Sequence, residues 1–120
     1  MESEVQVKPS IYVNINGTIT FGRVLAKALQ LNPGTVVEIR QSTDYPFAVH
    51  LITRPDNDNG KRIRDCDKVG LHVHNLQVAY QIRHYHPSAT NIIRLVLENT
   101  EPFTEGDARY WTLMPYKPAP

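Results

Sequence analysis

The chain has 120 residues, which is enough for one domain with a modest core but not for two independent domains. Thirteen Lys and Arg residues against twelve Asp and Glu residues give a net charge of +1, so no chain-wide positive field indicates a nucleic-acid partner, and such a partner would need a local patch. The single cysteine, Cys66, excludes an intrachain disulfide and with it the class of disulfide-stapled secreted domains.

The first half of the chain predicts four strands and one short helix. Residues 11–15 (IYVNI) alternate apolar and polar side chains, as a half-buried strand does. Asn16 and Gly17 favour a hairpin turn, and TITF follows as the return strand. Residues 23–31 predict a helix that the sequence NPG terminates, and VVEIRQ and FAVHLITR predict two more strands. The apolar stripe expected on this helix consists of Leu25, Ala28, Leu29 and Leu31.

The order of elements then starts again after a linker. Residues 55–60 (PDNDNG) contain only turn-forming residues. KRIRDCD and LHVH predict strands, Asn75 is placed as the N-cap of a second helix, and NIIRLVLEN and ARYWTLMPY predict the last strands. The second helix is expected to carry its apolar stripe on Leu76, Ala79, Tyr80 and Ile82. We therefore expect one domain over residues 1–120, with a first half at 11–54 and a second half at 61–116.

A tandem repeat of this kind has a physical reason. One half, with four strands and a single short helix, cannot bury both its sheet face and its edges. Two halves that close into one barrel can bury both. Joining them in one chain supplies each half with its partner at high effective concentration.

The segment at residues 17–41, GTITFGRVLAKALQLNPGTVVEIRQ, carries a turn glycine, two helical leucines, a second glycine turn and a V-E-apolar strand. The positions concerned are Gly17, Ile19, Leu25, Leu29, Leu31, Gly34, Val37, Glu38 and Ile39. With them the chain resembles the AbrB/SpoVT/MazE swapped-hairpin family over residues 11–54. The resemblance implies a mainly β fold with two short α-helices, an AbrB-like swapped-hairpin β-barrel. Two ββαββ halves of one chain would form the pseudo-dimer that relatives build from two chains.

Family members usually bind DNA as bacterial transcription regulators or antitoxins, so the resemblance implies a non-enzymatic DNA-binding module with double-stranded DNA as its partner. The chain departs from the pattern at Thr18, Gly22 and Ala26, where relatives have basic residues or proline. KRIRDCDK partly compensates, because arginines two apart on a strand point to one face. An alternative for that segment is a solvated strand with its own aspartates as partners. The residues expected to contact phosphates are Arg23, Lys27, Arg62, Arg64 and Lys68.

Two further hypotheses remain open. The first is a protein-interaction or scaffold barrel that has lost DNA binding. The second is a metal-binding protein, because His72 and His74 lie two apart on a strand and could hold Zn²⁺, although a strand with one wet face shows the same alternation. Tyr110 and Trp111 are expected to point to opposite faces of the last strand.

We expect no cofactor, no metal and no catalytic residue. The sequence has no Gly-rich phosphate loop and no Ser-centred elbow, and acidic neighbours disfavour the thiolate of Cys66. The N-terminal MESEVQVKPS has no apolar segment, and no apolar run is long enough to cross a bilayer. These features favour a cytoplasmic protein without membrane contact, either a monomer as a pseudo-dimer or a homodimer.

Overall fold

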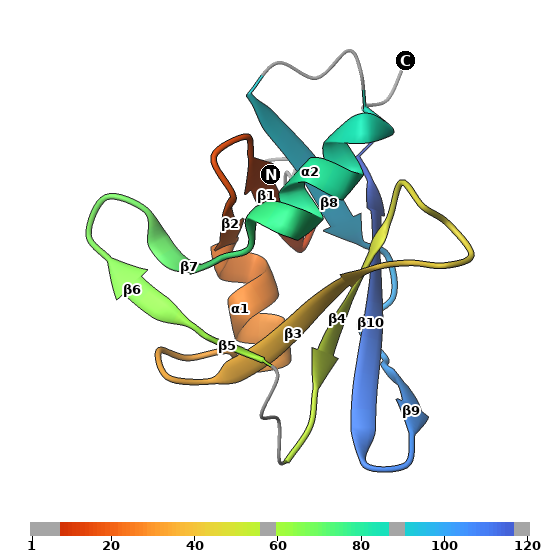
Figure 1. The fold of residues 1–120 in the computed structure, drawn as a ribbon. Coiled ribbons are helices and arrows are strands. Elements are labelled where there is room, and N and C mark those ends of the chain that lie inside the picture. Colours follow the sequence, from red (N-terminus) through yellow and green to blue (C-terminus); the bar gives the residue numbers. More distant parts are fainter. Residues whose placement is uncertain (1–7, 56–59, 87–90, 117–120) are drawn as a thin grey trace, which may run out of the picture.

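The computed structural model describes residues 8–55, 60–86 and 91–116, and in these the chain is mainly β with two short helices (Figure 1). The helices are α1 (Arg23–Leu29) and α2 (Leu76–His84). The strands are β1 (Ser10–Asn14), β2 (Thr18–Phe21), β3 (Val36–Gln41), β4 (Val49–Thr53), β5 (Lys61–Arg62), β6 (Arg64–Cys66), β7 (Gly70–His74), β8 (Ile92–Leu97), β9 (Phe103–Glu105) and β10 (Ala108–Pro115). The expectation of a mainly β fold with two short helices is thus confirmed. The predicted linker lies mostly outside the described residues.

The strands form a nearly closed antiparallel barrel. They follow the path β5-β3-β4-β10-β8-β1-β2-β7-β6, and β9 pairs with β10 outside this path. The two ends of the path meet, because only Ile63 separates β5 from β6. The amide of Ile63 donates to the carbonyl of Thr35 at 2.8 Å, and the amide of Gly34 donates to the carbonyl of Ile63 at 2.8 Å. These two bonds extend the pairing of β5 with β3 to Ile63, which connects β5 to β6.

The strand pairs of the first half have counterparts in the second half. The hairpin of β1 and β2 corresponds to that of β6 and β7, and the pair of β3 and β4 corresponds to that of β8 and β10. The first strand of the second half is divided by Ile63 into β5 and β6. The first strand of each half pairs with the third strand of the other, β1 with β8 and the β5 part with β3. Equivalent strands also pair across the middle, β2 with β7 and β4 with β10. The halves are therefore interleaved in one sheet.

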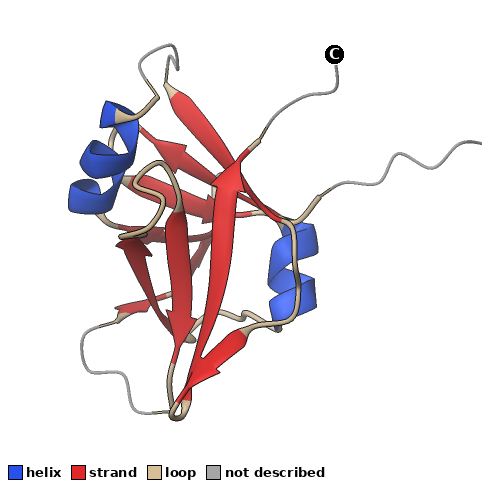
Figure 2. Cartoon of the chain, turned by 90° about the vertical axis from the view of Figure 1, so that its right-hand side faces the viewer, coloured by secondary structure: helices blue, strands red, loops and turns tan. Residues whose placement is uncertain are grey.

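One hydrophobic core fills the space inside the strands. Side chains from both halves line it, among them Ile11, Ile19, Leu25, Leu51, Ile63, Ile82, Leu95 and Leu113. The two helices lie on opposite sides of the strands (Figure 2). Each contributes one apolar face to the core. In the described part of the chain, no helix is long and apolar enough to cross a membrane.

The apolar stripe expected on the first helix is partly wrong. In α1, Leu25 and Ala26 are buried, whereas Ala28 is exposed. Gln30 caps the helix in the left-handed conformation, with φ of 56°, and this turns the chain so that Leu31 reaches the core from beyond the helix. Spacing along the sequence could not choose between Ala26 and Ala28, because they lie about equally far from the line of Leu25 and Leu29, on opposite sides of it.

The stripe expected on the second helix is wrong at two positions. Leu76 and Tyr80 are 56% and 78% exposed, and α2 instead buries Val78, Ala79 and Ile82. Both sets have helical spacing, so periodicity alone does not choose between them. The side chain of Asn75 accepts a hydrogen bond from the amide of Val78 at 3.1 Å, which makes Leu76 the first residue of the helix and leaves its side chain outside.

We predict that Ile63→Ala lowers the free energy of unfolding by about 2–4 kcal/mol, because the lost side chain is fully buried where the two ends of the strand path meet. Denaturant unfolding followed by circular dichroism measures this loss. Val69→Ala serves as the control, since Val69 is exposed in the turn after β6, and we expect it to change stability by less than about 0.5 kcal/mol. Equal effects of the two substitutions would contradict the closed path.

Candidate nucleic-acid interface

A groove of about 400 Å³ runs along the outer side of β5, β6 and β7. Its lining consists of Lys61, Arg62, Arg64, His72, Val73 and His74. No carboxylate of the described chain is among these residues, so three permanent cations and two imidazoles share one concave surface. We call this surface the basic groove. It can donate hydrogen bonds and positive charge to an anion such as a phosphate.

Strand alternation explains why these side chains meet. Ile63 is buried, so Arg62 and Arg64 on either side of it point outward. Val73 is buried in β7, so the two neighbouring histidines also point outward. Arg64 and His72 lie directly opposite each other in the pair of β6 and β7. The sequence predicted that the two arginines share a face, but it did not place the histidines beside them, because that depends on the strand pairing.

The other predicted cations lie elsewhere. Arg23 and Lys68 line a second groove, of about 670 Å³, between the start of α1 and the turn after β6. Asp65 and Asp67 line the same groove, so its positive and negative charges are equal in number. Lys27 is exposed in the last turn of α1 and lines neither groove. Of the five predicted residues, Arg62 and Arg64 therefore line the basic groove, Arg23 and Lys68 line the mixed groove, and Lys27 lies apart from both.

The two histidines of the basic groove lack the neighbours that a metal site needs. The Nδ1 atom of His72 lies 2.8 Å from the carbonyl oxygen of Gly70, so this nitrogen carries a proton and donates it. Among the described residues, no group of three or more His, Cys, Asp or Glu side chains is placed to hold a metal ion. Within the described ranges, His72 and His74 therefore have no third ligand with which to form a Zn²⁺ site.

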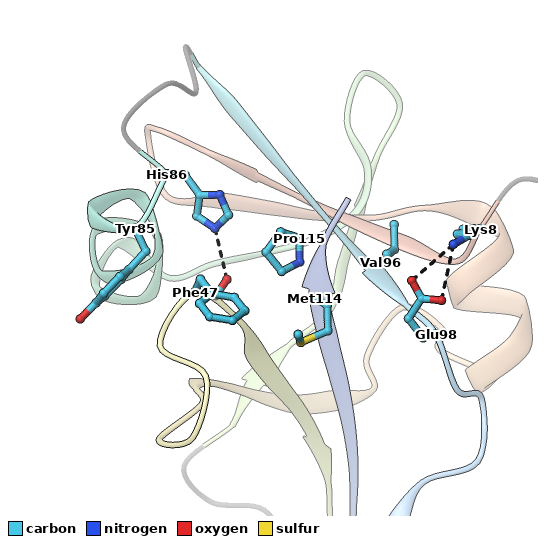
Figure 3. A pocket seen from close by; sticks show the side chains of 8 residues that line it. All are labelled: Lys8, Phe47, Tyr85, His86, Val96, Glu98, Met114 and Pro115. Atoms are coloured by element: carbon cyan, nitrogen blue, oxygen red, sulfur yellow. Dashed lines mark hydrogen bonds and ion pairs between the residues drawn. The ribbon is translucent and has the colours of Figure 1, made fainter. Parts of the chain in front are cut away.

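A third groove, of about 630 Å³, opens where the end of α2 approaches β8, β10 and the loop before β4 (Figure 3). Its lining is mainly apolar: Phe47, Tyr85, Val96, Met114 and Pro115, together with Lys8, His86 and Glu98. The Nε2 atom of His86 lies 3.2 Å from the carbonyl oxygen of Phe47, and Lys8 forms an ion pair with Glu98 at the opposite end. This groove has no surplus of positive charge, so it does not suit a phosphate backbone.

The cations on the outer face of β3, β4 and β10 are already paired. The buried carboxylate of Glu38 accepts from Arg54 at 2.9 Å and also forms an ion pair with Arg40. Arg54 further donates to the hydroxyl of Tyr110 at 3.3 Å. Because both arginines are already engaged with Glu38, they are unavailable for a phosphate without breaking a half-buried network.

An aromatic cluster lies next to this network. Tyr110 stacks on Phe103 with ring centroids 4.9 Å apart, and His50 meets both rings edge-on. Burial lowers the pKa of His50, and the charge of Asp44 opposes this shift only in part. Trp111 is buried whereas Tyr110 is half-buried on the outer face, which confirms the expected alternation of these two residues.

Comparisons with known proteins found no relative of the chain. No protein-family model matches the chain, and neither the curated proteins nor the solved structures contain a match to it. The resemblance to the AbrB/SpoVT/MazE family therefore stays a prediction from the residue pattern.

Gly17 offers a test of how the basic groove is positioned. Its φ is 95°, and a Cβ atom there would lie 2.8 Å from the ring of His74 and 3.0 Å from the Cα of Leu76. Gly34 has nearly the same φ, 92°, but a Cβ atom there would meet nothing within 4 Å. We predict that both Ala substitutions lose about 1–2 kcal/mol to backbone strain, and that Gly17→Ala loses about 1–3 kcal/mol more through the clash.

The clash also predicts a local signature. The ring resonances of His74 should shift in Gly17→Ala and stay in place in Gly34→Ala, as measured by two-dimensional NMR. Equal destabilisation of the two variants with an unmoved His74 ring would show that the close approach of Gly17 to this ring does not exist in solution.

Proposed function

We propose that the chain is a non-enzymatic DNA-binding protein of AbrB type, acting as a transcription regulator or as an antitoxin-like module. Its basic groove would hold the phosphate backbone of double-stranded DNA. The observation that carries the proposal is the gathering of three cations and two imidazoles in one groove that no described carboxylate lines. Phosphate contacts of this kind supply affinity without reading the base sequence.

The cations of the groove are free to act on a ligand. In the described part of the chain, side-chain ion pairs engage Lys8, Arg40 and Arg54, but none of the groove cations. The lysine and both arginines of the groove are exposed. A chain with a net charge of only +1 can thus present a strongly positive local surface.

The interleaving of the halves supports the AbrB-like part of the proposal. In a swapped-hairpin barrel, each half completes the sheet of the other, and here β1 pairs with β8 while β5 pairs with β3. One chain would then be the equivalent of a dimer, so the barrel needs no second copy to close. This leaves the outer surface for DNA or for a protein partner.

A second candidate function is a protein-interaction barrel. The observation that favours it is the apolar groove beside the end of α2, which exposes Phe47, Tyr85 and Met114 (Figure 3). Apolar grooves of this size are common sites for side chains of a partner. The two functions differ in their dependence on salt, because only phosphate binding releases counterions.

We predict that the protein binds duplex DNA at low salt and that Arg62→Gln/Arg64→Gln weakens this binding. Loss of two phosphate contacts should reduce the slope of log affinity against log salt concentration by about 1.8, since each contact contributes about 0.9. Fluorescence anisotropy with a labelled duplex, over a series of salt concentrations, measures the slope.

The matched control is Lys8→Gln/Arg109→Gln, which removes the same charge from two exposed positions that do not line the basic groove. This variant should keep the wild-type slope. If the wild-type protein does not bind duplex DNA at low salt, the DNA-binding proposal is wrong. If both double variants lose the same affinity, binding depends on net charge and the groove has no special role.

A further inference from the structure

We propose that the DNA-binding surface continues from the basic groove across β7, β2 and β1 to Arg94 on β8, and that Arg94 is a further phosphate-binding residue. The inference rests on the proposed function and adds to it the direction in which DNA crosses the barrel. It assigns a role to a residue that no sequence pattern singled out.

The register of the strands defines this surface. Arg64 lies opposite His72, His72 opposite Thr20, Thr20 opposite Tyr12, and Tyr12 opposite Arg94. We call these five residues the cross-strand row. Directly opposed residues of antiparallel strands point to the same face, so the whole row lies on one side of the sheet.

Burial shows that this side faces the solvent. In β1, β2 and β8, the residues on both sides of the row member are buried. In β7, Val73 on one side of His72 is buried, and Leu71 on the other side is partly buried and packs against the core. In β1, for example, Ile11 and Val13 are 1% exposed whereas Tyr12 between them is half-buried. In β8, Ile93 and Leu95 are likewise in the core, with Arg94 between them. The row is therefore an accessible line of polar side chains across five neighbouring strands.

The chemistry of the row matches a polyanion. Its members are two arginines, a histidine, a threonine and a tyrosine, all of which can donate hydrogen bonds. None is an acid, so no row member repels phosphate. Arginines stand at both ends, and the hydroxyl groups between them are of the kind that commonly contact DNA phosphates.

Contacts with neighbouring residues fix the side chain of Arg94 in position for such a contact. Its Cζ atom lies 4.0 Å from the ring centroid of Tyr116 and 5.9 Å from that of Tyr12. Its Nε–H group donates to the hydroxyl of Ser10 at 3.0 Å. The N–H groups on its two terminal nitrogens form no hydrogen bond with another described residue, so they can bind a phosphate in a bidentate manner. A side chain that is already fixed loses less entropy on binding.

The length of the row also suits DNA. Neighbouring strands lie about 4.8 Å apart, so four steps from β6 to β8 span roughly 19 Å along the curved surface. Phosphates of one DNA strand follow each other at about 3.4 Å along the helix axis. The row can therefore meet more than one phosphate, with Arg64 and Arg94 as separate anchors.

The test is Arg94→Gln in the full chain, with the same labelled duplex and salt series. Loss of one phosphate contact should reduce the salt slope by about 0.9 and weaken binding at every salt concentration. Arg109→Gln is the matched control and should keep the wild-type slope. Arg94→Lys keeps the positive charge but cannot reproduce the planar stacking on Tyr116, and it should restore the slope.

The outcomes distinguish the role of the cross-strand row in DNA binding from that of the basic groove. A wild-type slope in Arg94→Gln, together with a reduced slope in Arg62→Gln/Arg64→Gln, would overturn the row and leave the proposed function intact. If Arg94→Gln melts below the assay temperature, NMR of the Arg94 Nε–H resonance in the wild-type protein decides: a shift on addition of duplex DNA supports the row, and an unmoved resonance under conditions where the duplex binds overturns it. Absence of duplex binding by the wild-type protein would overturn both proposals.

Discussion

The pairing of β5 with β3 is the constraint on which the rest of the structure depends. Without it, β3 would have an open edge, and the segment that carries Arg62 and Arg64 would not be held against the barrel. Ile63 joins this pairing to that of β6 with β7, and its buried side chain anchors the junction in the core. One buried isoleucine between two exposed arginines thus links closure of the fold to exposure of positive charge.

Closure also has an electrostatic consequence. Lys61, Arg62 and Arg64 lie in one groove, where like charges repel one another and no described carboxylate of the lining compensates. Elsewhere cations have acidic partners, as Arg40 and Arg54 both do in Glu38. An excess of positive charge that is confined to one groove, in a chain whose net charge is close to zero, is characteristic of a functional surface. A bound phosphate backbone would relieve the repulsion.

Local signals in the sequence predicted most elements, and non-local pairing decided the rest. Alternation placed the strands around Tyr12 and Trp111, and the Asn16-Gly17 turn placed the first hairpin, because each signal lies within a few residues. The buried face of α2 was misplaced at Leu76 and Tyr80, since Leu76 and Val78 both have helical spacing to Ala79 or Ile82. The neighbours of His72 and Arg94 could not be predicted, because cross-strand partners depend on a register that no short segment encodes.

Hydrogen exchange at two backbone amides tests the closure most directly. The amides of Gly34 and Ile63 form the bonds that hold the junction of β5 and β6 against the segment before β3, whereas Leu51 lies in β4, which pairs with strands on both sides. If the barrel is closed in solution, NMR-detected exchange at Gly34 and Ile63 should be slowed to a degree comparable with Leu51. Rapid exchange at both amides, with Leu51 protected, would show an open edge and contradict the interleaved barrel.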